Sequence, residues 1–359
     1  MSMDNNGQER QAFTPKSRLH AILNGQSADR PACICPGGMM NMVTDGLQKE
    51  AGVGLPEAHT DPRKMADLAE AVIKDGIFEN CGVPFCMTVE AEAMGAKVTL
   101  GNNLFEPHVV EYAMDDVDRY AELKPIDLGS GRAKVVLDAL RILKEEVTDA
   151  PIIGNLTGPV STAASLVDPE KFYMQLRKKN ENAHKVMDFV TEQLIRFGTA
   201  QVEAGADVIT IADPSGTGEI LGPKYFSEFA VDYINRLTDA LHEAGAEVIV
   251  HICGQMKYVY DQLKAVRSDA LSFDAVVSLR EARKHLPGRV LMGNVSTFAV
   301  ELTDPENVDA LTRKCIGSGA DIVSPACGLG MGSPLPNVRA ILKAVRSESG
   351  SSASGQGQK

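Results

Sequence analysis

Short apolar runs alternate with longer amphipathic stretches along most of this 359-residue chain. The runs are about four to seven residues long and rich in apolar and β-branched side chains, as expected of buried parallel strands. Eight strands with intervening helices predict a single (β/α)8 barrel, an α/β fold. The expected strands are Ala32–Pro36, Asn80–Phe85, Pro151–Leu156, Asp207–Ala212, Glu247–Ile252, Ala270–Phe273, Arg289–Gly293 and Asp321–Ser324. The expected helices are Pro62–Lys74, Gly131–Glu145, Ala183–Glu203, Lys224–Glu243, Gln255–Arg267, Leu279–His285, Pro305–Ser318 and Leu335–Arg346.

A local repeat supports this alternation. The segments EAGADVITIAD, EAGAEVIVHIC and GSGADIVSPAC share a helix end, a glycine, an apolar strand and then a polar or sulfur residue. Gly205, Gly245 and Gly319 suit the left-handed position that ends a helix. A doubly wound open sheet shows the same alternation, so it remains a second fold candidate.

Composition limits the function classes. Apolar residues make up 44% of the chain, which allows a large core, and the net charge of −12 argues against a nucleic-acid surface. No apolar stretch approaches the roughly 20 residues that span a membrane, and the polar N-terminus lacks a signal sequence, which predicts a cytoplasmic protein. Seven irregularly spaced cysteines do not form a disulfide framework. We expect one catalytic domain over residues 14–346, between disordered ends at 1–13 and 347–359.

Polar and sulfur-containing residues occur at the C-terminal ends of several predicted strands. This placement favours the barrel over the doubly wound sheet, because barrel enzymes build their sites at the C-terminal ends of several strands. Met39, in the Gly37–Met40 turn, and Glu90 are added as candidates to line this mouth, although Glu90 fits a solvated helix face equally well. The strand-end residues are Asn155, Asp213, His251, Cys253, Asp274, Asn294 and Cys327. Of these, Asn155, Asp213 and Asn294 are candidates to bind substrate.

The sharpest local signal is His251-Ile252-Cys253. Alternate residues of a strand face the same side, so His251 and Cys253 project together. Imidazole and thiolate are preferred zinc ligands, and Cys327 can supply the third protein donor of a catalytic zinc site. The alternative is a hydrogen-bonded core histidine with two small hydrophobic cysteines. Asp274 fits a fourth ligand, a group that orients His251, or neither.

With these residues in hand, the chain resembles the uroporphyrinogen decarboxylase superfamily, in particular its branch of cobalamin-dependent methyltransferases. The resemblance covers about 330 residues, through strings that include PEAHTDPRKMADLAEA, PFCMTVEAEAMGA, GNLTGPVSTAASL, DPSGTGEILGPKYFSEF, HICGQ, LMGNVS and SPACGLG. It implies a (β/α)8 fold and a zinc site at His251, Cys253 and Cys327. It also implies a corrinoid carried by a separate protein, whose cobalt exchanges a methyl group with a small-molecule donor or acceptor.

This branch contains two chemistries. In one, zinc activates a thiol such as coenzyme M for attack on methyl-cobalt; in the other, zinc polarises a methyl ether that Co(I) attacks. The methionine-rich turn GGMMNM suggests an apolar mouth and leads us to expect an aryl methyl ether, with the thiol reaction as the alternative. A metal-free decarboxylase is a further alternative, but its arginine-rich signature is replaced by RPACICPGGMMNMV, where Arg30 is the lone cation. A non-catalytic zinc scaffold and a homodimer also remain open.

Overall fold

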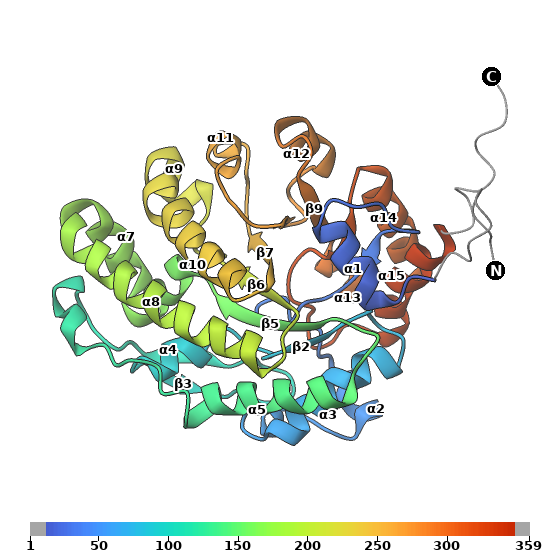
Figure 1. Cartoon of the computed structure of the whole chain (residues 1–359), viewed down its shortest axis with the longest axis horizontal. Coiled ribbons are helices and arrows are strands. Elements are labelled where there is room, and N and C mark those ends of the chain that lie inside the picture. The colour runs from blue at the N-terminus through green and yellow to red at the C-terminus, as the bar shows by residue number, and fades with distance from the viewer. Residues whose placement is uncertain (1–11, 349–359) are drawn as a thin grey trace.

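The eight predicted strands are present in the computed structural model, which describes residues 12–348. They form one parallel sheet in the order β1-β10-β9-β8-β7-β6-β5-β2, so the sheet curls into the predicted (β/α)8 barrel. In Figure 1 the helices form an outer ring around these strands. The strands are β1 (Ala32–Cys33), β2 (Cys81–Val83), β5 (Ile152–Thr157), β6 (Val208–Ala212), β7 (Glu247–Ile252), β8 (Ala270–Phe273), β9 (Val290–Val295) and β10 (Ile322–Pro325).

Most of the predicted helices also form. Their starts follow ordinary capping chemistry: the Asp61 side chain accepts from the backbone N–H groups of Arg63 and Lys64, ahead of Pro62. Gly205, Gly245 and Gly319 have positive φ angles, as their place after a helix predicts. These helices are α3 (Pro62–Lys74), α5 (Gly131–Glu146), α8 (Asn180–Ala204), α9 (Gly218–Tyr225), η3 (Phe226–Val231), α10 (Asp232–Glu243), α12 (Leu279–His285), α14 (Pro305–Gly317) and α15 (Leu335–Glu348).

Other elements differ from the prediction or were not expected. The helix expected at Gln255–Arg267 shrinks to α11 (Tyr260–Leu263), because the segment before it forms a turn instead of a helix. A two-stranded hairpin, β3 (Lys97–Thr99) and β4 (His108–Glu111), projects after β2. The remaining elements are α1 (Pro15–Leu23), α2 (Asp45–Ala51), η1 (Glu57–His59), α4 (Val89–Ala93), η2 (Val117–Glu122), α6 (Pro159–Leu166), α7 (Pro169–Lys178) and α13 (Thr297–Leu302).

The predicted disordered ends fall mainly outside the described residues. Residues 1–11 and 349–359 are not described, while Ser347 and Glu348 continue α15.

The barrel closes through a seam between β1 and β2. The Asn80 side chain bridges it twice: Nδ2 donates to the Cys35 carbonyl and Oδ1 accepts from the Cys35 N–H, both at 2.9 Å. One backbone bond, from the Glu79 N–H to the Cys33 carbonyl at 2.9 Å, joins them. Gly82 permits this close approach, because a Cβ there would lie 1.7 Å from the Pro36 oxygen.

The N-terminal end of the barrel is closed by apolar packing. Leu19, Ile22 and Leu23 of α1 pack with inward side chains of the strands, among them Ile249 and Met292. This end opposes the mouth, and barrels use it for stability rather than catalysis.

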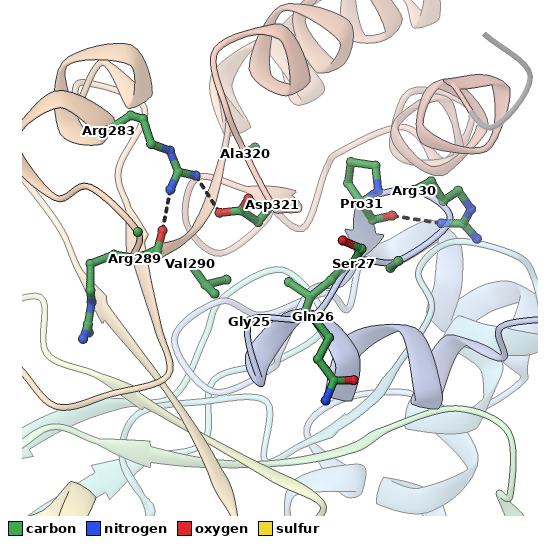
Figure 2. A pocket seen from close by; sticks show the side chains of 13 residues that line it. Gly25, Gln26, Ser27, Arg30, Pro31, Arg283, Arg289, Val290, Ala320 and Asp321 are labelled. Carbon is green, nitrogen blue, oxygen red and sulfur yellow. Dashed lines mark hydrogen bonds and ion pairs between the residues drawn. The ribbon is translucent and has the colours of Figure 1, made fainter. Parts of the chain in front are cut away.

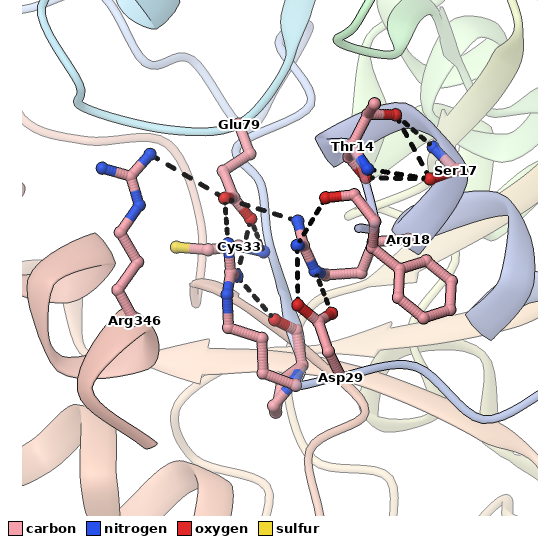
Figure 3. Close-up of polar contacts among 10 residues, drawn as sticks. Thr14, Ser17, Arg18, Asp29, Cys33, Glu79 and Arg346 are labelled. Carbon is pink, nitrogen blue, oxygen red and sulfur yellow. Dashed lines mark hydrogen bonds and ion pairs between the residues drawn. The ribbon is translucent and has the colours of Figure 1, made fainter. Parts of the chain in front are cut away.

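Beside this apolar packing, the carboxylate of Glu79 is almost fully buried and is surrounded by arginine side chains. Arg30 binds it with two nitrogens, at 2.9 and 2.5 Å, and Arg18 and Arg346 approach to 3.7 and 3.9 Å (Figure 3).

A pocket of about 530 Å³ opens at the same end, between segment 25–31 and the residues Arg283, Arg289 and Asp321 (Figure 2). Arg283 is already paired with Asp321 at 2.6 Å. Arg30 is therefore a structural cation, held at the end of the barrel that lies opposite the mouth.

Candidate functional site

The predicted strand-end residues do gather at one end of the barrel. His251 lies near the end of β7, Cys253 directly follows that strand, and Asp274 follows β8. Asn294 lies in β9, and Cys327 comes two residues after β10. Because β7, β8, β9 and β10 are successive neighbours, their carboxyl ends form one side of the mouth.

His251 is fully buried, and both of its ring nitrogens have partners. The Ser272 hydroxyl contacts the Met40 sulfur at 3.9 Å and the His251 Nδ1 at 2.9 Å. If that hydroxyl donates to sulfur, its oxygen accepts the Nδ1–H, and the Nε2 lone pair faces the Cys253 sulfur at 3.2 Å. Burial lowers the pKa of His251 to about 4, so the imidazole is neutral near pH 7. Neutral imidazole is the form that binds metals.

Cys253 and Cys327 are both half-buried. Their interaction lowers the pKa of Cys327 and raises that of Cys253, because one thiol supports the thiolate of the other. The nearby negative charge of Asp274 works against ionisation of either thiol. A second ionisation in this pair therefore needs a compensating positive charge.

The donor chemistry of this trio fits zinc. An imidazole nitrogen and two thiols from segments far apart in the chain are brought to the same side of the mouth, and both cysteines are only half-buried. Over residues 12–348, no group of three or more His, Cys, Asp or Glu side chains lies in an arrangement that could hold a metal ion. In this structure the imidazole is paired with the Cys253 thiol, and zinc binding by the trio remains a prediction.

Asp274 lies against the loop that carries Cys253. Its carboxylate accepts from the Gly254 N–H at 3.3 Å and from the Val276 N–H at 3.1 Å. Asn294 holds the Asp274 and Val277 carbonyls through Nδ2, at 2.9 and 2.8 Å. In this arrangement Asp274 supports the loop, and the Asn294 amide is engaged with the backbone.

Asn155 and Asp213 are also engaged within the protein. Asn155 Nδ2 donates to the Pro36 and Val83 carbonyls at 2.8 and 3.0 Å, and thereby ties the ends of β1, β2 and β5 together. Asp213 is fully buried and accepts from the Ser161 N–H at 2.8 Å and from the Ser161 hydroxyl at 2.6 Å, at the start of α6. Burial raises the pKa of Asp213. A direct contact with substrate stays a prediction for both residues.

Glu90 belongs to the interior, so the solvated-face alternative was wrong. Its carboxylate accepts from the Thr157 N–H at 2.8 Å and from the Thr157 hydroxyl at 3.1 Å. Burial raises the pKa of Glu90 to about 7. Met39 is half-buried beside the loop that holds Cys327, since a Cβ on Gly328 would lie 2.5 Å from the Met39 carbonyl oxygen.

Three polar residues near these elements were missed. Ser272 pairs with His251 across β7 and β8, and strand register alone could have indicated it. Arg132 is buried and donates to Cys86 and Thr88, at 3.2 and 2.9 Å. His59 is buried, with neither ring nitrogen hydrogen-bonded among the described residues. No pattern in the sequence marks the last two, because their partners are distant in the chain.

Comparisons with known proteins agree with this architecture. The family model described as uroporphyrinogen decarboxylase (URO-D) matches residues 14–348. The chain is 29% identical to the methylcobamide:CoM methyltransferase MtbA of Methanosarcina acetivorans, over 93% of this chain and 98% of that protein. It is 32% identical to the methylcobamide:CoM methyltransferase MtaA of Methanosarcina barkeri, over 92% of this chain and 97% of that protein.

A solved structure described as a methyltransferase from Methanosarcina mazei matches with a TM-score of 0.86 at 30% identity. The match covers 94% of this chain and 99% of that one. Among the helices of residues 12–348, none has the length and apolar character that crossing a bilayer requires. The barrel and the family match over nearly its whole length lead to one conclusion: this chain belongs to the uroporphyrinogen decarboxylase family.

Proposed function

We propose that this protein is a methyltransferase that moves a methyl group from the cobalt of a corrinoid to a small thiol. In this proposal a separate protein carries the corrinoid and presents it to the single barrel that the described residues form. The observation that carries the proposal is the placement of His251, Cys253 and Cys327 at the carboxyl ends of β7 and β10, on one side of the mouth. The two Methanosarcina relatives, named as methylcobamide:CoM methyltransferases, support it.

In this proposal His251, Cys253 and Cys327 hold a zinc ion, which as a Lewis acid lowers the pKa of the substrate thiol. The neutral His251 ring is fixed by Ser272, so its Nε2 is pre-oriented towards the sulfurs. Asp274 keeps the Cys253 loop in place through Gly254. The half-exposed sulfurs give substrate access from the mouth, while the buried histidine excludes water from below.

The methyl transfer from cobalt to the thiol needs no further oxidant, reductant or co-reactant. The substrate sulfur forms a bond to the methyl carbon, and the cobalt–carbon bond breaks with its electron pair left on cobalt. The thiol proton leaves to water. The chain's part is to position the thiol and keep the reacting sulfur dry, which raises the reactivity of a thiolate.

The aryl methyl ether, our first expectation from the sequence, is less well supported than the thiol. Met40 and Met42 are fully buried in the core, and Met39 alone of that turn is half-exposed, so the turn does not form a methionine-lined wall. The relatives' names also specify coenzyme M. For the decarboxylase reaction, Arg30 is bound to Glu79 at the opposite end of the barrel and does not reach a substrate in the mouth.

The test uses purified protein, methylcobalamin and a panel of thiols, with cobalt absorbance as the readout. We expect thiol-dependent loss of the methyl-cobalt spectrum and formation of an equal amount of thioether. A parallel reaction contains Co(I) corrinoid with methoxylated aromatics and methylamines. Methylation of Co(I) by an ether, with no thiol reaction, would restore the first expectation. Catalysis by Cys253→Ala at the wild-type rate would remove the proposed site.

A further inference from the structure

Large apolar side chains stand exposed on loop after loop around the mouth. We call five of them the apolar crown. Exposed side chains of this size and number in one region mark a binding surface more often than a plain solvated face. The crown consists of Phe105, Tyr258, Val276, Phe298 and Leu302, which are 67%, 57%, 53%, 76% and 75% exposed.

Each crown residue lies close to a loop of the candidate site. Tyr258 comes five residues after Cys253 on the β7 loop. Val276 follows Asp274 by two residues, and its N–H donates to that carboxylate at 3.1 Å. Phe298 is the second residue of α13 and comes four residues after Asn294. The crown thus follows the neighbouring strands β7, β8 and β9 in order.

Phe298 and Leu302 border the loop that carries Cys327. They are four residues apart on α13, so they lie on one face of that helix. Glu301, on the same helix, packs against the loop after β10: a Cβ on Gly330 would lie 2.5 Å from its carboxylate. The most exposed apolar pair of the crown is therefore carried next to Cys327.

Phe105 approaches the same loop from the other side. It lies at the tip of the β3–β4 hairpin, next to Glu106, whose carboxylate accepts from Asn41 Nδ2 at 3.3 Å. The Asn41 carbonyl in turn accepts from the Leu329 N–H at 2.8 Å. The loop after β10 is therefore linked both to α13, through Glu301, and to the hairpin that carries Phe105, through Asn41 and Glu106.

We infer that the apolar crown is the docking surface for the corrinoid-carrying protein, an inference that rests on the proposed function. Methyl transfer needs the cobalt-bound carbon within bonding distance of a sulfur held beside Cys253 and Cys327, so the carrier must cover the face that the crown borders. The chain's own undescribed ends do not supply a matching apolar segment, since residues 1–11 and 349–359 contain no Leu, Ile, Val or aromatic residue. Contact through apolar side chains also makes the association insensitive to salt.

The experiment compares two methyl donors on the same variants. One donor is free methylcobalamin, and the other is a purified corrinoid protein loaded with methylcobalamin. For Phe298→Ser combined with Leu302→Ser, we expect the KM for the protein-bound donor to rise about tenfold or more, as for other buried interface anchors. The rate with free methylcobalamin should stay at the wild-type level, which also shows that the variant is folded.

Met174→Ser is the matched control. Met174 is 47% exposed on α7, which follows β5 and lies away from the crown strands, so both donors should react as with the wild type. Equal loss with both donors in the crown variant, or no loss with either, overturns the inference. A wild type that uses the protein-bound donor no better than the free one overturns it as well. A wild-type dimer that dissociates in the crown variant assigns the surface to a second copy instead.

Direct binding of the loaded corrinoid protein, measured by calorimetry at low and high salt, separates this inference from the proposed function. In one outcome the wild type binds the carrier, the crown variant does not, and no thiol is methylated. This result supports the docking surface and contradicts the proposed thiol methylation. If thiols are methylated from free methylcobalamin while both proteins bind the carrier equally, then the reaction stands and the docking surface fails.

Discussion

The side-chain amide of Asn294 donates to the backbone carbonyl of Asp274 over 2.9 Å, and so links the end of β8 to β9. The same nitrogen reaches the Val277 carbonyl at 2.8 Å. One side chain therefore fixes both ends of the turn that begins with Asp274. The position of this carboxylate beside the Cys253 loop therefore depends on Asn294, which forms no hydrogen bond with His251, Cys253 or Cys327 within residues 12–348.

Replacing Asn294 with alanine should therefore loosen this turn. Two carbonyls lose their donor, and each unpaired buried group costs about 1–3 kcal/mol. We expect a loss of that order in the free energy of unfolding, measured in urea. Asn24→Ala is the control, because that amide also makes two bonds, to His20 and Glu247, but at an exposed position. Equal effects in the two variants would contradict a specific role for Asn294.

Zinc content should depend on the mouth cysteines and not on the core ones. Purified wild type should hold about one zinc per chain, as a three-ligand catalytic site does. Cys253→Ala and Cys327→Ala should each lose most of it, because a two-donor site binds weakly. Cys81→Ala, which removes a fully buried thiol from β2, should keep the wild-type amount. Plasma emission spectroscopy after dialysis measures this, and full zinc in all three variants would remove the metal site.

Glu90→Gln should change how stability depends on pH. The folded-state pKa of Glu90 is raised to about 7, above its ordinary value of 4.5. The wild type therefore has this group's full contribution below about pH 4.5 and loses it as pH rises through 7. Glutamine imitates the neutral acid: its oxygen accepts the Thr157 N–H, and its nitrogen donates to the Thr157 hydroxyl.

The stability of Glu90→Gln relative to wild type should thus increase from pH 5 to pH 8, by on the order of 2–3 kcal/mol. Urea unfolding at several pH values measures the difference. The exposed Glu145→Gln serves as the control and should give a difference that does not vary with pH. A flat profile for Glu90→Gln would mean that the carboxylate is not buried in solution.

Gly82→Ala should be strongly destabilising. The added Cβ would lie 1.7 Å from the Pro36 oxygen, and backbone on both sides of the seam would have to separate. We expect a loss of about 3 kcal/mol or more. Gly317→Ala, at the end of α14 with no atom within 4 Å of the added carbon, should be neutral or slightly stabilising. Thermal unfolding of the two variants gives the comparison.

Much of the barrel was predictable because its signals are local. Buried strands read as short apolar runs, and helix ends carry glycines such as Gly205, so element types follow from neighbouring residues. The β3–β4 hairpin was not predictable, since its strands are short and largely exposed and show no clear alternation. The segment after Cys253 has helical periodicity, but it forms a turn before α11 begins.

The candidate site was predictable only in part. His251, Cys253 and Cys327 could be grouped because a barrel brings strand ends together, and the structure places them at the carboxyl ends of β7 and β10. The roles of Asn155, Asp213 and Glu90 could not be read, because their partners are backbone groups of other loops. Residue type indicates that a side chain is polar, but not whether its hydrogen-bonding groups bind the protein's own backbone or a ligand. His59 shows the same limit, since nothing in its segment indicates burial.

The Asn80 bridge has a consequence for how the barrel moves. Every other neighbouring pair of strands is held by a ladder of backbone bonds, whereas β1 and β2 meet through the carboxamides of Asn80 and Asn155 and a few main-chain contacts. We therefore expect an opening motion of the barrel to begin at the seam between β1 and β2. The Gly37–Met40 turn follows β1 at this seam. We therefore expect any widening of the mouth that admits a large ligand to start at this turn.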